Sequence, residues 1–144
     1  MARHAPWAVH FFKRHPSDDP EESVPARQFL DECPDLVAAK LIAVVKAVAD
    51  APPPQFSGGG KWEAMHGEMN GVYEVRADGP KRRHYRLFCV LQQPGPDTGL
   101  TKPAIVLISG ASTAFRTKLT AADYRRIKAL VDEYARRKPR SLEP

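Results

Sequence analysis

Cysteine is scarce in this 144-residue sequence, which contains only Cys33 and Cys89. Two cysteines do not make the disulfide framework of a small secreted domain, so we expect both to be reduced thiols in a cytoplasmic protein. Metal-ligand motifs are also missing, because His66-Gly67-Glu68 has neither a cysteine nearby nor a second histidine four residues on. The sequence therefore predicts no metal site and no bound cofactor.

Long hydrophobic runs are absent as well. No run approaches the ~20 apolar residues of a membrane-spanning helix, and His10, Lys13 and Arg14 interrupt the N-terminal stretch too early for a signal segment. Hydrophobic residues still form 42% of the chain, enough for one core at this length. We expect no membrane association and a single domain over residues 1–144. Its expected parts are a core at about 6–137, flexible loops at 51–61 and 93–102, and a frayed tail at 138–144.

Acidic residues are in short supply in the second part of the chain. Residues 1–60 hold 6 Lys and Arg against 8 Asp and Glu, whereas residues 61–144 hold 16 against 9. This asymmetry favours a polyanionic partner for the second part. A basic surface that only keeps the protein in solution is the alternative interpretation.

The segment 71–91 is rich in the β-branched, aromatic and aliphatic residues that favour strands, and Asp-Gly-Pro in its middle is typical of a turn. We therefore expect two strands joined by a basic turn. Side chains alternate faces along a strand, so Glu74, Arg76, His84 and Arg86 share one face, and the other face is apolar enough to carry helices. Cations on a rigid sheet are preorganised for an anionic ligand.

Hydrophobic periodicity and capping signals predict the remaining elements. These are a strand at 7–12, helices at 23–32 and 35–50, a central strand at 104–109 and a last helix that begins at Thr120. Ser23 is expected to cap the first helix, and pairs Asp132–Arg136 and Glu133–Arg137 are expected on the solvent side of the last. The order β-α-α-β-β-β-α predicts an α+β domain. In it, a helical hairpin covers one face of a mostly antiparallel sheet, followed by a C-terminal helix.

Three short sequence cores, in this order, resemble the RelE/ParE toxin superfamily, and most of all its HigB-like, phage-derived branch. They are Val72-Tyr73-Glu74-Val75-Arg76, His84-Tyr85-Arg86-Leu87-Phe88, and the apolar strand with its basic continuation at 105–118. The resemblance covers about residues 60–137 and implies a RelE-like fold. It also implies a type II toxin that cleaves mRNA on the ribosome as an endoribonuclease and is neutralised by a cognate antitoxin protein.

The resemblance implies roles for individual residues. Arg86 matches the arginine that contacts the scissile phosphate, and Arg76 matches a basic position on the preceding strand. Arg116, with Lys118 beside it, matches the basic position after the last strand. Glu63 falls where some members place a catalytic glutamate.

Cleavage of RNA without a metal proceeds by attack of the 2′-OH on the adjacent phosphate, which needs a base, cations and an acid. Arginine grips two phosphate oxygens at once, which suits the three matched arginines. His84 can move a proton in either role near neutral pH, Glu63 or Glu74 can act as the base, and Lys118 can act as the acid. Four further cations are expected to contact the RNA backbone: Lys61, Lys81, Arg82 and Arg83.

Two other functions stay open at this point. A ParE-like toxin of the same fold binds gyrase and cleaves no RNA, and a non-catalytic RNA-binding or ribosome-binding protein would need no proton donor. Several family members carry a Tyr or His soon after the last-strand arginine, but residues 117–120 here read Thr-Lys-Leu-Thr. This difference favours the second alternative, the non-catalytic protein. Two of these residues also have a purely structural interpretation. Arg76 then only forms an ion pair with Glu74 or with a cross-strand carboxylate, and His84 is an exposed residue at a strand end.

Overall fold

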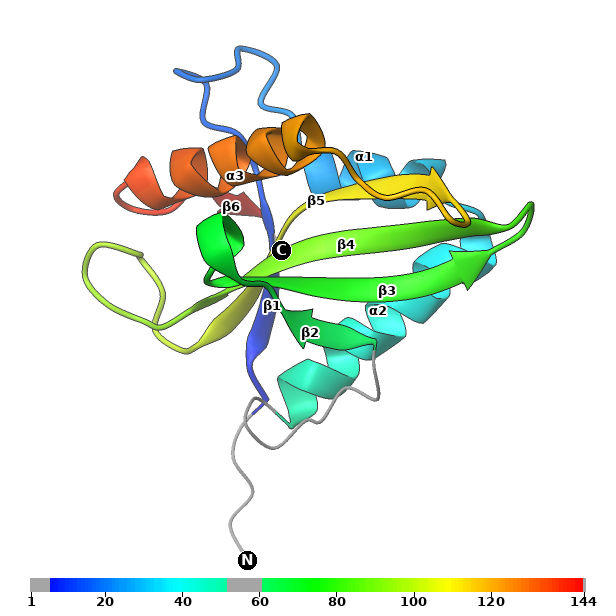
Figure 1. The fold of residues 1–144 in the computed structure, drawn as a ribbon. Helices are drawn as coiled ribbons and strands as arrows, with labels where there is room; N and C mark the ends of the chain where they lie inside the picture. The colour runs from blue at the N-terminus through cyan, green and yellow to red at the C-terminus, as the bar shows by residue number, and fades with distance from the viewer. Residues whose placement is uncertain (1–5, 52–60, 144) are drawn as a thin grey trace, which may run out of the picture.

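The computed structural model describes residues 6–51 and 61–143, and these residues build a six-stranded sheet with helices on both faces (Figure 1). The strands are β1 (Ala8–Phe12), β2 (Trp62–Ala64), β3 (Val72–Gly79), β4 (Arg83–Gln92), β5 (Ala104–Ala114) and β6 (Leu142–Glu143). The helices are α1 (Pro25–Glu32), α2 (Asp35–Asp50) and α3 (Ala121–Arg136), with a 3-10 turn η2 (Gly67–Met69).

The strand order is β2-β3-β4-β5-β1-β6. β1 runs parallel to β5, and the other neighbouring pairs are antiparallel. The predicted α+β class with a mostly antiparallel sheet is therefore confirmed. Strands β2 and β6 at the two edges were not predicted from the sequence.

The alternation of side chains along the strands divides the apolar residues into two layers. Leu87 and Cys89 of β4 pack with the α2 stripe that includes Val37 and Leu41, whereas Phe88 between them packs with α3 on the other face. Figure 1 shows the same arrangement, with α1 and α2 on one side of the sheet and α3 on the other. The expected helical hairpin against the apolar face is confirmed, and both cysteines are buried free thiols.

One glycine allows the close approach of α1 to the sheet. A Cβ atom at Gly110 of β5 would overlap the ring of Phe29, which α1 places directly on this strand. Because any larger side chain would push the ring away, Gly110 fixes how closely α1 packs on β5.

The hairpin between β3 and β4 is longer than expected. Asp78 and Gly79, which were assigned to the turn, continue β3 and pair with His84 and Arg83. The turn itself consists of residues 80–82. At this end of the hairpin the Asp78 carboxylate meets the His84 ring across the strands, with Oδ1 and Nδ1 2.5 Å apart.

The predicted cap of the first helix is wrong. The helix begins at Pro25 with Val24 at its N-cap position and no side-chain cap. The Ser23 hydroxyl donates instead to Asp19 Oδ2 at 2.6 Å, within the preceding loop. At the last helix, by contrast, the predicted start is confirmed, since Thr120 and Asp123 form a reciprocal capping box.

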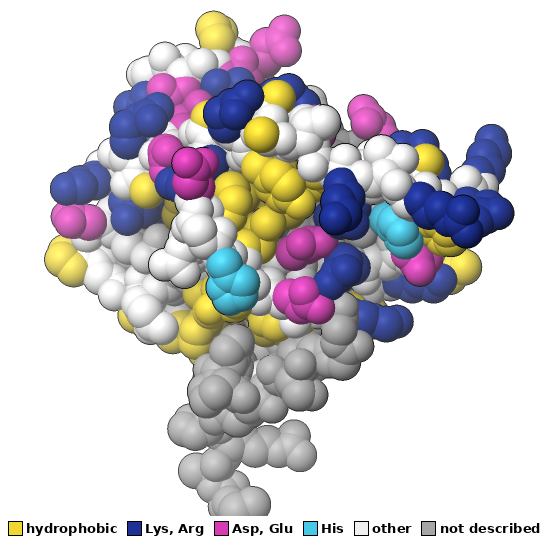
Figure 2. Space-filling view, viewed as in Figure 1, with side chains coloured by type: hydrophobic (Ala, Val, Ile, Leu, Met, Phe, Trp, Pro, Cys, Tyr) yellow, Lys and Arg dark blue, Asp and Glu magenta, His cyan; other side chains and the backbone are white. Residues whose placement is uncertain are grey.

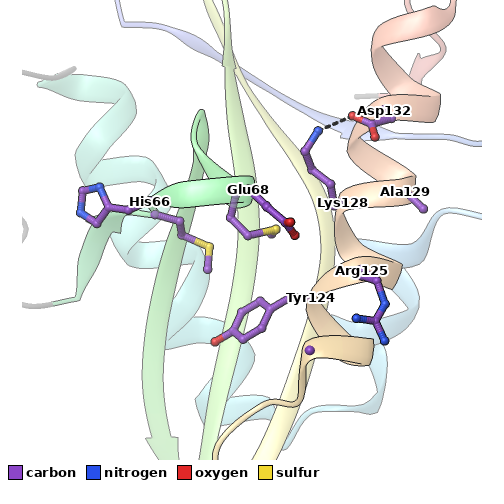
Figure 3. Close-up of a pocket in the computed structure, with 10 residues that line it drawn as sticks. His66, Glu68, Tyr124, Arg125, Lys128, Ala129 and Asp132 are labelled. Carbon is purple, nitrogen blue, oxygen red and sulfur yellow. Dashed lines mark hydrogen bonds and ion pairs between the residues drawn. The ribbon is translucent and has the colours of Figure 1, made fainter.

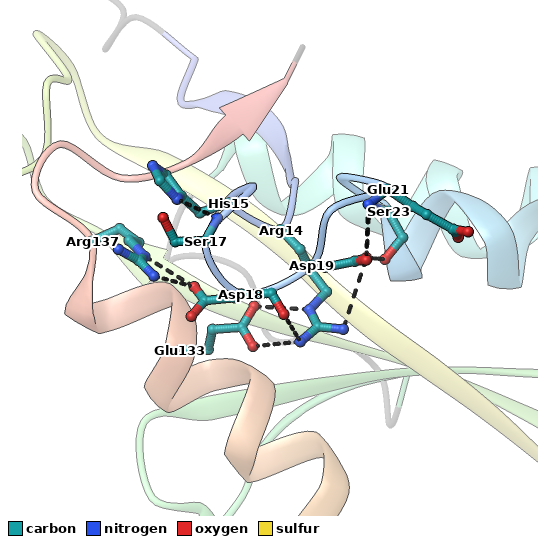
Figure 4. A network of polar contacts seen from close by, with 9 residues as sticks. All are labelled: Arg14, His15, Ser17, Asp18, Asp19, Glu21, Ser23, Glu133 and Arg137. Atoms are coloured by element: carbon teal, nitrogen blue, oxygen red, sulfur yellow. Dashed lines mark hydrogen bonds and ion pairs between the residues drawn. The ribbon is translucent and has the colours of Figure 1, made fainter.

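The expected ion pairs within the last helix are also wrong, because tertiary partners replace them. Glu133 is buried and accepts two hydrogen bonds of 2.9 Å from Arg14 in the loop after β1. Arg137 pairs with Asp18 of the same loop at 2.8 Å (Figure 4). Asp132 pairs with Lys128 one turn earlier. The loop after β1 is thus tied to α3 by charged hydrogen bonds.

The tail that was expected to fray is paired with the sheet. Leu142 and Glu143 form β6 against Phe12 and Phe11 of β1. Upstream of β6, the Arg140 amide donates to the Thr98 carbonyl at 3.2 Å, which joins the tail to the 93–102 loop. Most of the other expected loop, 51–61, lies outside the described residues, apart from its ends.

No helix among residues 6–51 and 61–143 combines the length and the apolar character needed to cross a membrane.

Candidate functional site

Two arginines lie directly opposite each other on neighbouring strands. Arg76 of β3 pairs in register with Arg86 of β4, an arrangement that is destabilising for like charges unless an anion lies between them. Glu74 supplies the anion, with its Oε1 atom 2.8 Å from Arg86 Nε and 3.6 Å from Arg76 Nε. Glu63 of β2 adds a second carboxylate, 2.7 Å from Arg76 Nη2. We refer to Glu63, Glu74, Arg76 and Arg86 as the arginine–glutamate cluster.

The two arginines differ in how firmly they are held. The Arg86 side chain is only 15% exposed and donates a further hydrogen bond of 3.1 Å to Thr113 Oγ1 on β5. The Arg76 side chain is 41% exposed, and its buried Nε atom makes no hydrogen bond to any described residue, because 3.6 Å to Glu74 is too long for one. Buried donors without an acceptor are rare in folded proteins. An anion can reach the exposed end of the Arg76 guanidinium but not its Nε atom, whereas Arg86 is fixed in place.

The arginine pair borders a groove of about 530 Å³ at the outer edge of β3. Its described lining consists of Lys40, Val44, Lys61, Arg76, Ala77, Asp78, His84 and Arg86. Four of these side chains are lysine or arginine and one is a carboxylate. With the paired carboxylates Glu63 and Glu74 included, four cations face three carboxylates, so the groove keeps a small net positive charge. We call it the basic groove. The structure thus brings together four of the predicted residues, namely Lys61, Arg76, His84 and Arg86.

Lys40 was missed from the sequence, although its position carried a signal. It lies three residues after Val37 and four before Val44 on α2, at the border of the helix stripe that packs on the sheet. A lysine at such a border extends its ammonium group past the edge of the sheet while its methylene stem packs. Here Lys40 lines the basic groove beside β3.

His84 has a fixed ring orientation. Its ring stacks on Phe115 with centroids 4.3 Å apart, and its Nδ1 atom lies 2.5 Å from Asp78 Oδ1. Because a carboxylate only accepts, the Nδ1 atom carries the proton in this pair, and Nε2 is the nitrogen left for another partner. His84 is the second residue of β4 and its side chain is 32% exposed, so its interpretation as an exposed strand-end residue is not overturned.

The hairpin turn carries cations that point outward. Lys81 and Arg82 are exposed and have positive φ angles of 60° and 57°. Arg83 is held against β5 by a 3.0 Å hydrogen bond to Ser112 Oγ. Figure 2 shows lysine and arginine side chains gathered over this end of the β3–β4 hairpin. The turn cations thus lie next to the basic groove and do not line it.

Arg116 and Lys118 follow β5 at the same end of the sheet. The Phe115 amide donates to the Arg82 carbonyl at 2.8 Å, which places this segment beside the hairpin turn. Both side chains are exposed, neither lines the basic groove, and neither has a hydrogen-bond or ion-pair partner in the part of the chain that the structure describes. The structure thus does not place Arg116 in the basic groove with Arg86, and the role that the resemblance implies for Arg116 stays a prediction.

Left-handed backbone is concentrated among these cations. Arg116 has φ of 65°, so it shares with Lys81 and Arg82 a conformation that costs a residue with a side chain about 1 kcal/mol. All three cations lie in the short segments that directly follow β3 or β5. Their side chains project from defined positions at one end of the sheet.

The described residues do not place together the ligands that a metal ion needs. Among the residues that the structure describes, no group of three or more His, Cys, Asp or Glu side chains is placed to hold a metal ion. The acidic side chains of the arginine–glutamate cluster are engaged by arginines. The lysine and arginine side chains that line the basic groove are suited to bind an anion.

A second, mostly apolar groove lies on the α3 face, between η2 and the helix (Figure 3). It measures about 570 Å³, and Met65, Met69 and Tyr124 contribute apolar surface to it. Charged residues on its rim include Lys128 and Asp132, which pair with each other. None of the predicted site residues lines this groove.

Comparison of the chain with protein-family models, with curated proteins and with solved structures found no match in any of the three.

Proposed function

We propose that the protein is a ribosome-dependent mRNA endoribonuclease, a type II toxin with a RelE-like fold that a cognate antitoxin neutralises. The observation that carries this proposal is the cross-strand pair Arg76–Arg86 at the border of a net cationic groove. The element order supports the finer fold assignment, since a strand and a helical hairpin precede an antiparallel hairpin, a central strand and a helix.

A phosphate diester fits the arginine pair better than a purely structural role does. The Arg76 side chain is 41% exposed, so its terminal nitrogens can bind phosphate oxygens, whereas its Nε atom is buried. Its competing partner Glu63 is 50% exposed, and such surface pairs contribute only about 0–1 kcal/mol. RNA can therefore displace Glu63, while Arg86 remains fixed by Glu74 and Thr113 and supplies a preorganised charge.

Proton transfer in this proposal falls to His84 and Glu63. The Nε2 atom of His84 is available at the groove, and displacement of Glu63 from Arg76 frees a carboxylate beside the phosphate. Glu74 is nearly buried between two arginines, which suits it to orient them. In the reaction, one of the two groups accepts the 2′-OH proton and the other donates a proton to the departing 5′-oxygen.

The test is primer-extension mapping of cut sites on mRNA with purified ribosomes. Wild-type protein is expected to cut, and Arg76→Ala is expected to cut at least about 100-fold more slowly, as for loss of a preorganised charge donor. Lys46→Ala is a matched control, because this lysine is exposed on α2 and does not line the groove. Wild-type protein that binds ribosomes without cutting mRNA would contradict the proposal.

Non-catalytic binding to RNA or the ribosome is the second candidate. One observation favours it, because the segment after Arg116 presents neither a tyrosine nor a histidine to the basic groove. The geometry gives less support to a ParE-like gyrase-binding toxin, because a protein that binds gyrase does not need a pair of phosphate-binding arginines. The antitoxin is expected to bury the basic groove or α3, so co-expression of a neutralising partner should relieve growth arrest.

A further inference from the structure

A second basic surface lies where α3 ends. A cavity of about 490 Å³ is lined there by His15, Arg136, Arg137, Lys138, Pro139, Arg140 and Ser141. We call the five basic residues of this set the α3-end patch. Figure 4 shows two of them, His15 from the loop after β1 and Arg137 from the end of the helix.

The α3-end patch is separate from the basic groove. Ser141, in its lining, directly precedes β6, the edge strand next to β1, whereas the basic groove lies along β3 near the opposite edge. Strands β4 and β5 lie between these edges, and no described residue lines both cavities. A ligand at one surface therefore does not occupy the other.

The patch carries more positive charge than its carboxylate partners neutralise. Four of the five residues 136–140 are lysine or arginine. Asp18 pairs with Arg137 at 2.8 Å, and Asp97 lies 3.7 Å from Lys138 with both side chains 66% exposed. A surface pair of this kind holds its lysine weakly. The helix dipole favours cations in the last turn of α3, but Lys138 and Arg140 lie beyond that turn.

Two of the donors in the patch are held in fixed orientations. The Arg140 guanidinium donates to the Arg137 carbonyl at 2.8 Å and to Gln92 Oε1 at 3.3 Å, and it lies over the Tyr134 ring. The His15 Nδ1 atom accepts from the Ser17 amide at 3.0 Å, so the neutral ring carries its proton on Nε2. Oriented donors beside an uncompensated charge are preorganised for an anion.

We propose that the α3-end patch binds the phosphodiester backbone of RNA without regard to sequence, as a second site in addition to the basic groove. Three of its cations are arginines, whose planar fork matches two phosphate oxygens. Pro139 is the only apolar residue in the described lining, which contains no Phe, Tyr or Trp on which bases could stack. It also lacks the apolar anchors by which proteins and membranes are usually bound. Contacts to phosphates position a nucleic acid and do not read its sequence.

The test measures binding of a fluorescent, fully 2′-O-methylated RNA, which cannot be cleaved because it lacks the attacking hydroxyl. The variant is Arg136→Gln with Lys138→Gln, two exposed cations. Anisotropy titrations at several salt concentrations give the log–log slope, which should become shallower by about 1.4 for two contacts, with affinity on the order of 10-fold lower at 0.1 M salt. The matched control, Lys46→Gln with Lys102→Gln, removes two exposed charges outside both cavities and should leave the slope unchanged.

Two results would overturn this inference. One is a slope for Arg136→Gln/Lys138→Gln equal to that of the wild type, with circular dichroism showing that the variant is folded. The other is competition by a polyglutamate peptide of equal charge as effective as competition by RNA, which would make the patch a site for acidic proteins. The measurement involves no cleavage, so wild-type protein that fails to cut mRNA would refute the proposed function and leave the RNA-binding result standing.

Discussion

Replacement of Arg86 by alanine should reduce both the stability of the protein and its cleavage of mRNA. The guanidinium donates to Glu74 at 2.8 Å and to Thr113 at 3.1 Å. Without it, the Glu74 side chain, which is 12% exposed, keeps only the Nε atom of Arg76 at 3.6 Å as a cationic neighbour. A lost hydrogen bond to a charged, nearly buried group costs about 1.5–3 kcal/mol. We expect about 2 kcal/mol, which lowers Tm by roughly 6–8 °C in a chain of this size.

A double-mutant cycle separates the loss of the ion pair from the loss of side-chain packing. Arg86→Ala leaves the Glu74 carboxylate without its closest cation, and Glu74→Gln removes that negative charge. The double variant should therefore be more stable, by about 1–2 kcal/mol, than the sum of the two single losses of unfolding free energy predicts. Arg83→Ala is the control, because it loses only a hydrogen bond to the neutral Ser112 hydroxyl and should cost about 1 kcal/mol. Urea unfolding followed by circular dichroism gives each free energy of unfolding.

The cleavage assay is run at a temperature at which Arg86→Ala remains folded. Cleavage of ribosome-bound mRNA should fall about 100-fold or more, and Arg86→Lys should recover little of it because lysine lacks the two-pronged grip. A melting temperature equal to that of the wild type would refute the argument from the buried carboxylate. Full cleavage by folded Arg86→Ala would refute the phosphate-binding role and favour the non-catalytic or gyrase-binding alternatives.

Three further outcomes are expected. Glu63→Gln should tighten RNA binding, because the neutral side chain competes less strongly with RNA for Arg76. If Glu63 is the general base, the same variant should also have a lower kcat. Separate measurements of kcat and KM test both roles, and unchanged values exclude them. Glu133→Gln should cost about 2 kcal/mol in urea unfolding, since it breaks the charged hydrogen bonds from Arg14. The hydrogen bond from Arg137 lowers the pKa of Asp18 from its ordinary value of 3.8. The ion pair therefore contributes to the free energy of unfolding above pH 3.8, and this contribution is lost as the pH falls through the lowered pKa. In Asp18→Asn the free energy of unfolding should fall less steeply with decreasing pH in the acid range. A pH dependence equal to that of the wild type would contradict this.

The sequence by itself determined the features that depend on local periodicity. The two-residue alternation along 72–76 and 84–88 was enough to place Glu74, Arg76, His84 and Arg86 on one face, and the structure confirms that placement. The same holds for α2 and for the capping box of α3, because these depend on residues three or four positions apart.

Only the tertiary structure decided which charged groups meet. The partner of Glu133 is Arg14, 119 positions away, and not the arginine one helical turn on. β6 forms because β1 offers it a sheet edge, although the tail has no strand signal of its own. Lys40 joins the groove through the packing of α2 on the sheet. The physical reason is that a charged side chain pairs with the acceptor that it reaches in the packed molecule, and packing is determined by burial across the whole chain.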